Sequence, residues 1–111
     1  MRQRTKQFAL RIIKLFRALP KTEEARILGR QVLRSGTAAA ANYRSACRGR
    51  SRADFISKIG ITVEEADETV FWLELLIDAN IVKEAKLEKL LAEANELVRI
   101  FAATRTTAKS R

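Results

Sequence analysis

Apolar residues recur at three- and four-residue steps along most of the chain, which is the period of an α-helix with one buried face. The N-terminal segment shows this pattern up to Pro20, whose ring disfavours helical geometry in the residue before it. The apolar positions of this first predicted helix are Phe8, Ile12, Leu15 and Leu19. They share one face, so the segment is predicted to be a helix that ends at Pro20.

A second helix is predicted from about Glu23 to Cys47, with Thr22 as its N-cap and acidic residues in its first turn. At 100° per residue, one side carries mostly small residues and the opposite side carries arginines. The inward side comprises Leu28, Val32, Ser35, Ala39, Tyr43 and Ala46, and the outward side comprises Arg26, Arg30, Arg34, Arg44 and Arg48. Because the inward side chains are so small, we expect a close helix contact around residues 35–42.

A turn at Arg48-Gly49-Arg50 separates this helix from a third, which opens with the capping-box-like sequence SRAD at residues 51–54. The core stripe of the third helix is predicted to be Phe55, Ile59, Val63, Ala66, Val70, Leu73 and Ile77. A second apolar strip lies elsewhere around the helix and consists of Ile61, Trp72, Leu75 and Leu76. One four-helix bundle cannot bury both strips, so the second is predicted to be a subunit interface.

Residues 78–80 are predicted to close the third helix, and a fourth follows after a short loop. Its inward stripe is Leu87, Leu90, Leu91, Ala94, Leu97, Val98 and Phe101. Residues 104–111 are polar and basic without periodicity, which predicts a frayed tail. The expected fold is therefore all-α: a single domain over residues 1–111, an antiparallel up-down four-helix bundle with its core over residues 5–103.

Composition narrows the class of protein further. The 111 residues suffice for one domain, and one proline and four glycines are too few for a turn-rich β fold. The single cysteine cannot form an internal disulfide, which suits a reducing compartment. No apolar run approaches the roughly 18 residues of a membrane span, and the N-terminus lacks an uninterrupted signal-type apolar core. We therefore expect a cytoplasmic protein with no membrane partner.

Charge is distributed unevenly within the total of +9. Residues 1–52 contain 14 Lys or Arg and two acidic residues, whereas residues 53–111 contain 8 Lys or Arg and 11 acidic residues. The basic half could bind the phosphates of RNA or DNA, or it could pair with acidic faces of subunits or partners. The candidate nucleic-acid contacts are Arg26, Arg30, Arg34, Arg44, Arg48, Arg50 and Arg52.

Catalytic chemistry finds little support in the sequence. The chain has no histidine, the commonest general base and a frequent metal ligand. Glu65 and Glu68, followed later by Glu93 and Glu96, superficially resemble the paired carboxylates of helical magnesium-dependent pyrophosphohydrolases. Glu96 points away from the predicted inward face of its helix, so these four groups do not converge. We expect no enzymatic activity, no metal site and no cofactor.

The stretch from Leu28 to Val82 resembles the core of the bacterial 23S rRNA intervening-sequence proteins. A glutamine followed by basic and small residues leads to an asparagine, then a Gly/Arg turn, then a Ser-x-x-Asp-Phe helix start. The matching positions are Gln31, Arg34, Ser35, Asn42, Gly49, Ser51, Asp54, Phe55, Glu65, Glu68, Trp72 and Leu73. The resemblance covers about residues 8–101.

This resemblance implies an antiparallel four-helix bundle that assembles into a ring-like homopentamer. Similar bundles serve as accessory proteins of diversity-generating retroelements, where a basic surface binds nucleic acid and the reverse transcriptase. It therefore implies three partners: further copies of the chain, RNA or DNA, and a reverse transcriptase or other protein. Where many members read Asn-Ile-Ala-Glu-Gly, this chain reads Asn42-Tyr43-Arg44-Ser45-Ala46, which makes its turn more basic.

Overall fold

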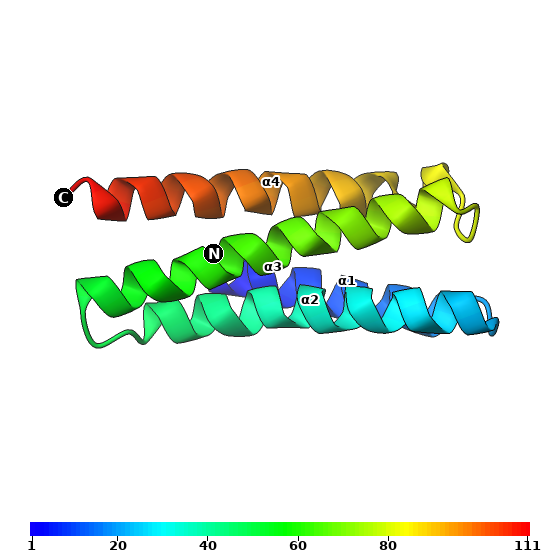
Figure 1. Cartoon of the computed structure of the whole chain (residues 1–111), viewed down its shortest axis with the longest axis horizontal. Helices are drawn as coiled ribbons and strands as arrows, with labels where there is room; N and C mark the ends of the chain where they lie inside the picture. The colour runs from blue at the N-terminus through cyan, green and yellow to red at the C-terminus, as the bar shows by residue number, and fades with distance from the viewer.

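The computed structural model describes residues 1–111 and consists of four helices joined by short connections. The helices are α1 (Arg2–Ala18), α2 (Glu23–Cys47), α3 (Arg52–Asp78) and α4 (Glu84–Lys109). Consecutive helices run in opposite directions along a molecule of 46 × 20 × 19 Å (Figure 1). The predicted all-α four-helix architecture is confirmed, including the limits of the second helix.

Helix ends fall where side chains satisfy the free backbone groups. The Thr22 hydroxyl accepts a hydrogen bond of 3.2 Å from the Ala25 N–H, and the Ser51 hydroxyl accepts one of 3.1 Å from the Asp54 N–H. Asp54 in turn accepts from the Arg50 N–H at 3.3 Å, which closes the α2–α3 turn. After α3, Asn80 adopts a positive φ of 60°, the left-handed geometry that ends many helices.

The core forms mainly from the apolar stripes predicted for the four helices, although Phe55 of the predicted α3 stripe is half-buried outside the core cluster. Each helix contributes at least one fully buried residue, and the largest are Phe8, Ile12, Ile59, Leu73, Leu76, Leu87, Leu97 and Phe101. Tyr43 lies inward as predicted and stacks on Phe101 with ring centroids 5.4 Å apart. Desolvation raises the pKa of the Tyr43 hydroxyl, in accord with this packed position.

Two predictions fail against the structure. Residues 104–111 are not a frayed tail, because α4 continues to Lys109. Arg52 donates a 2.8 Å hydrogen bond from Nε to the Ala108 carbonyl, and so occupies one of the acceptors that a helix end leaves free. Leu76 is not an interface residue: it is 0% exposed and belongs to the core of the single chain.

Small residues let α1 and α2 approach closely. A Cβ placed on Gly36 would lie 2.9 Å from Ile12 Cγ1, and one on Gly29 would lie 2.7 Å from Leu19 Cδ1. Both glycines are buried within the unbroken α2 helix. The conformational cost of glycine in a helix is offset here by the packing it permits.

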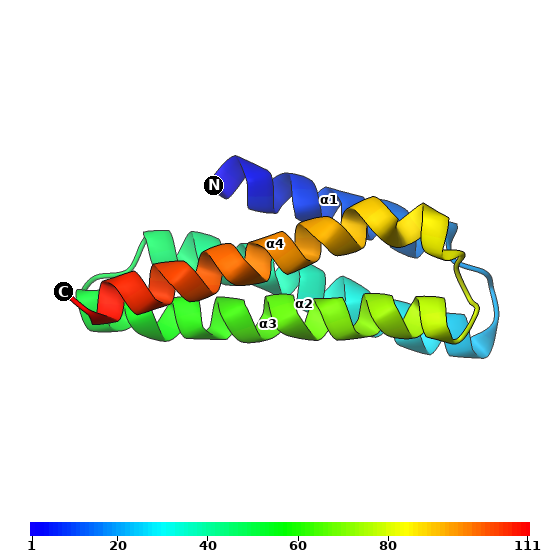
Figure 2. The same ribbon diagram turned by 90° about the horizontal axis from the view of Figure 1, so that it is seen from above.

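α1 is the shortest helix and covers only part of the bundle. Its start lies partway along the molecule, whereas the other three helices extend to the end that holds the α2–α3 turn (Figures 1 and 2). α1 packs mainly on α2 and touches α4 far less. The bundle therefore has one weakly closed side, between α1 and α4.

Candidate nucleic-acid interface

The outward face of α2 presents most of the arginines that the sequence singles out. Arg26, Arg30, Arg44 and Arg48 are exposed, and none forms an ion pair within the chain. Arg26 and Arg30 are one turn apart, about 6 Å along the helix axis. Spacing on this scale suits contacts with successive phosphates of a nucleic-acid strand.

Arg34 is different, because it is engaged by acidic residues of α3. Its guanidinium lies 3.0 and 3.2 Å from the two carboxylate oxygens of Glu65 and 2.8 Å from Glu68 Oε1. The hydrogen bond to Glu65, and to a smaller extent the one to Glu68, raises the pKa of Arg34. Arg34 also lowers the pKa of Glu68, to which the Trp72 indole donates from Nε1 at 3.2 Å. Arg34 therefore joins two helices and is not a free cation.

The arginines around the α2–α3 turn also include both free side chains and one that is bound within the chain. Arg48 and Arg50 are exposed on the turn and make no ion pair within the chain. Arg52 ties the start of α3 to the end of α4 through Ala108. Its Nη groups have no partner within the chain, so Arg52 can still add positive charge at this end.

α1 supplies cations beside those of α2, and the sequence prediction did not include them among the candidate contacts. A depression of about 360 Å³ between the two helices is lined by Arg2, Lys6 and Arg44, together with Ala40 and Ala41. A second, of about 320 Å³, is lined by Arg17, Lys21, Arg26 and Arg30. The four-residue step between Arg2 and Lys6 was the available signal, because it places both on one face of α1.

The outward face of α3 is apolar and acidic instead. Ile61 is 42% exposed and Phe71 is 52% exposed, while Trp72 and Leu75 are half-buried. Phe71 was missed by the sequence prediction, and its ring packs edge-on against Trp72 with centroids 4.9 Å apart. Of the four predicted interface residues, Ile61, Trp72 and Leu75 thus remain available at the surface, with Phe71 in place of Leu76.

The carboxylates considered for metal binding do not converge. Glu65 and Glu68 accept hydrogen bonds from Arg34, Glu93 accepts two from Arg4 at 2.7 Å, and Glu96 pairs with Arg99. No group of three or more Asp, Glu or Cys side chains is placed to hold a metal ion. The bonds from Arg4 lower the pKa of Glu93, which keeps that carboxylate charged against α1.

None of the four helices combines the length and apolar character needed to cross a bilayer. The protein is thus an all-α four-helix bundle with two different surfaces. Cations gather over α1 and α2, and the outward side of α3 is acidic and apolar. The family profile described as 23S rRNA-intervening sequence protein matches residues 1–103, and the chain belongs to that family.

A solved structure agrees with this assignment. The chain is 35% identical to a protein with unknown function from the S23 ribosomal protein family of Bacteroides thetaiotaomicron VPI-5482, whose crystal structure was determined at 1.70 Å resolution. The match has a TM-score of 0.87 and covers 94% of this chain and 96% of that chain. No curated protein matches the chain.

Proposed function

We propose that this protein is a non-enzymatic, homo-oligomeric bundle that binds RNA or DNA through the basic side formed by α1 and α2. One observation carries the proposal: the arginine facing α3 is paired within the chain, whereas those on the outward side of α2 are not. The proposed phosphate contacts are Arg26, Arg30, Arg44, Arg48, Arg50 and Arg52, joined by Arg2, Lys6, Arg17 and Lys21 of the adjacent segment. Arg34 is omitted because its guanidinium is already occupied.

Self-association is part of the proposal and would strengthen the same function. The exposed Ile61 and Phe71 and the half-buried Trp72 and Leu75 leave apolar surface on α3 that a second copy would cover. Family membership favours a ring-like pentamer, which would repeat the basic side around the particle. Several weak phosphate footprints on one assembly raise the overall affinity through effective concentration.

A protein-interaction scaffold without a nucleic-acid role is the second candidate. The pairing of Arg34 with Glu65 and Glu68 favours it, because it shows that arginines of α2 can be neutralised by acidic residues of this fold. In that case the remaining arginines would pair with the acidic α3 face of another subunit or with an acidic partner.

Fluorescence anisotropy with labelled single- and double-stranded RNA and DNA separates the two candidates. A phosphate binder loses affinity steeply with salt, by a log–log slope of about −0.9 per neutralised phosphate for duplex DNA and about −0.7 for single strands. The scaffold function requires no appreciable binding, even at low salt, from a sample shown by circular dichroism and sedimentation to be folded and oligomeric. That second result would overturn the nucleic-acid proposal.

A further inference from the structure

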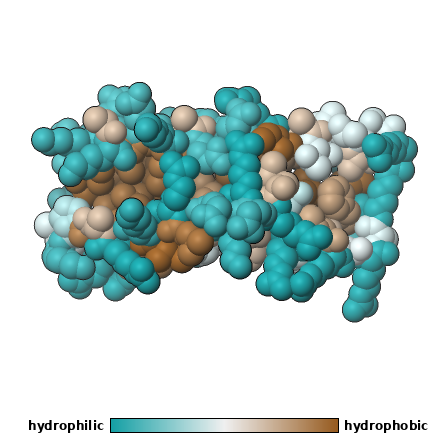
Figure 3. Space-filling view, turned by 180° about the vertical axis from the view of Figure 1, so that it is seen from behind, coloured by the Kyte–Doolittle hydropathy of each residue, from teal (hydrophilic) through white to brown (hydrophobic).

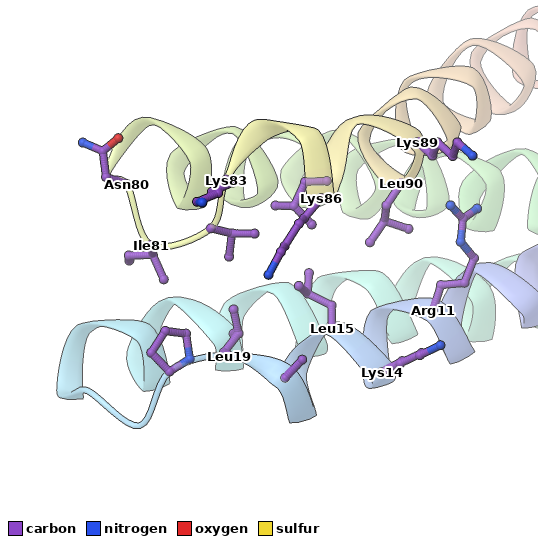
Figure 4. A pocket seen from close by; sticks show the side chains of 14 residues that line it. Arg11, Lys14, Leu15, Leu19, Asn80, Ile81, Lys83, Lys86, Lys89 and Leu90 are labelled. Carbon is purple, nitrogen blue, oxygen red and sulfur yellow. The ribbon is translucent and has the colours of Figure 1, made fainter.

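An open groove lies on the weakly closed side of the bundle, where the C-terminal half of α1 faces the start of α4. Its volume is about 690 Å³, and the loop between α3 and α4 closes one end. Figure 4 shows its two walls, with Leu15 on α1 and Leu90 on α4 pointing into the groove and Leu19, just after α1, nearer the loop that holds Ile81. The apolar residues that line it are Leu15, Ala18, Leu19, Ile81, Val82, Leu87 and Leu90.

The rim of this groove is positively charged on both sides. Arg11 and Lys14 project from α1, and Lys83, Lys86 and Lys89 from the start of α4. All five are exposed, none forms an ion pair within the chain, and no acidic residue lines the groove. In Figure 4 the side chains of Lys86 and Arg11 extend into the space between the two helices.

The groove differs from the proposed phosphate-binding side in its chemistry. Apolar side chains form its floor, and hydrophilic residues surround apolar ones at this end of the bundle in Figure 3. No aromatic residue lines it, so it offers no platform on which bases could stack. Phosphates would pair with the cations of the rim but would leave the apolar floor in contact with water.

We propose that the groove binds an amphipathic helix of a partner protein that has acidic residues along both edges of its apolar stripe. Such a helix would lie between α1 and α4 as a further helix of the bundle, with its apolar stripe on Leu15 and Leu90. Its carboxylates would meet Lys86 and Lys89 on one side and Arg11 and Lys14 on the other. This mode buries apolar surface and relieves the repulsion among five like charges at once.

The probe is a fluorescein-labelled peptide of about 18 residues, or five turns, with leucine at helical spacing and glutamate along both edges of the stripe. Two matched peptides serve as controls: one with lysine in place of each glutamate, and one with the acidic sequence scrambled so that the stripe is lost. In anisotropy titrations against the full chain, both controls are expected to bind at least about tenfold more weakly than the probe. Equal binding of the scrambled peptide would reduce the effect to non-specific attraction and overturn the proposal.

Charge-reversal variants test whether the probe peptide binds in the groove. Lys86→Glu/Lys89→Glu is expected to weaken probe binding at least about tenfold, while Arg105→Glu/Lys109→Glu, an equal charge change outside the groove on the same helix, changes it little. Similar losses in the two variants would contradict the groove as the site. A fall in particle mass on sedimentation for Lys86→Glu/Lys89→Glu would show that a second copy fills the groove, and would also overturn the proposal. Nucleic-acid binding is measured separately, so either proposal can fail alone.

Discussion

The α2–α3 contact and the α1–α4 contact differ in the residues that face each other and in how closely the helices pack. Between α2 and α3, the Thr69 hydroxyl donates to the buried Ser35 hydroxyl at 2.8 Å, and Arg34 spans to Glu65 and Glu68. Between α1 and α4, the Arg4–Glu93 pair is the single ion pair, and beyond it lies a groove rimmed by cations alone.

The difference shows what closes a helix pair in this fold. Small residues allow α2 and α3 to approach, and charges of opposite sign lie on facing helices. At the α1–α4 side, Arg11 and Lys14 of α1 line the same groove as Lys86 and Lys89 of α4, so charges of the same sign lie on its two walls. The closed contact holds the bundle together, and the open one leaves the groove that we propose as a partner-binding surface.

The largest expected difference in stability compares Leu76 with Leu15. Leu76 is 0% exposed and lies two turns along α3 from Thr69, on the side that meets α2, whereas Leu15 is half-buried at the groove. Leu76→Ala is expected to lower the free energy of unfolding by about 2–5 kcal/mol. Leu15→Ala should cost about 1 kcal/mol, because water already reaches this side chain. Urea denaturation at fixed protein concentration measures both, and equal losses would mean that the groove is closed in solution.

Glycine substitutions give a smaller contrast with opposite signs. Gly36→Ala would place a methyl group 2.9 Å from the branched Ile12 side chain, so about 1–3 kcal/mol of overpacking should outweigh the gain in helix propensity. A Cβ placed on Gly60 would lie 3.5 Å from Arg105 Nε, which is an ordinary contact with a flexible side chain. Gly60→Ala should therefore stabilise the chain by up to about 1 kcal/mol. Thermal unfolding of the two variants tests this, and a stabilised Gly36→Ala protein would refute the close α1–α2 packing.

The smallest predicted effect is a dependence of stability on pH. Arg34 lowers the pKa of Glu68, and Arg4 lowers that of Glu93, below the unfolded value of about 4.5. The stabilisation is therefore fully present above about pH 4.5 and is lost as the pH falls through the lower, folded pKa values. Urea unfolding of the wild type and of Glu68→Gln across this range checks the sign. The variant should show the shallower loss on acidification, and identical curves would exclude a contribution from Glu68.

Much of the fold could be predicted because local signals agreed with packing. The apolar stripes, the Thr22 and Ser51 caps and the close contact near Ser35 all follow from short-range patterns. Leu76 was assigned to the wrong face because its angular position borders both strips, and only the position of α2 beside α3 decides between them. The end of α4 was missed because its partner, Arg52, lies 56 residues earlier in the chain.

The candidate site was less predictable for the same reason. An arginine stripe on one helix says which side chains point outward, but not which of them a neighbouring helix neutralises. Arg34 differs from Arg30 only through the nearby Glu65 and Glu68 of α3, and Lys6 approaches Arg44 only through the packing of α1 on α2. Charges that pair or cluster across helices require the three-dimensional arrangement.

The most direct test of nucleic-acid binding compares two double charge reversals of equal size by fluorescence anisotropy with labelled RNA and DNA. Arg26→Glu/Arg30→Glu alters the proposed phosphate-binding side, and Lys86→Glu/Lys89→Glu alters the groove. We predict that the first variant, folded and oligomeric, loses most of its affinity and that its log–log salt slope falls in magnitude by about 2, one for each phosphate contact removed. The second variant should retain most of the affinity and most of the salt slope. Unchanged affinity in the first variant, or equal losses in the two, would contradict the assignment of the α1–α2 side as the nucleic-acid interface.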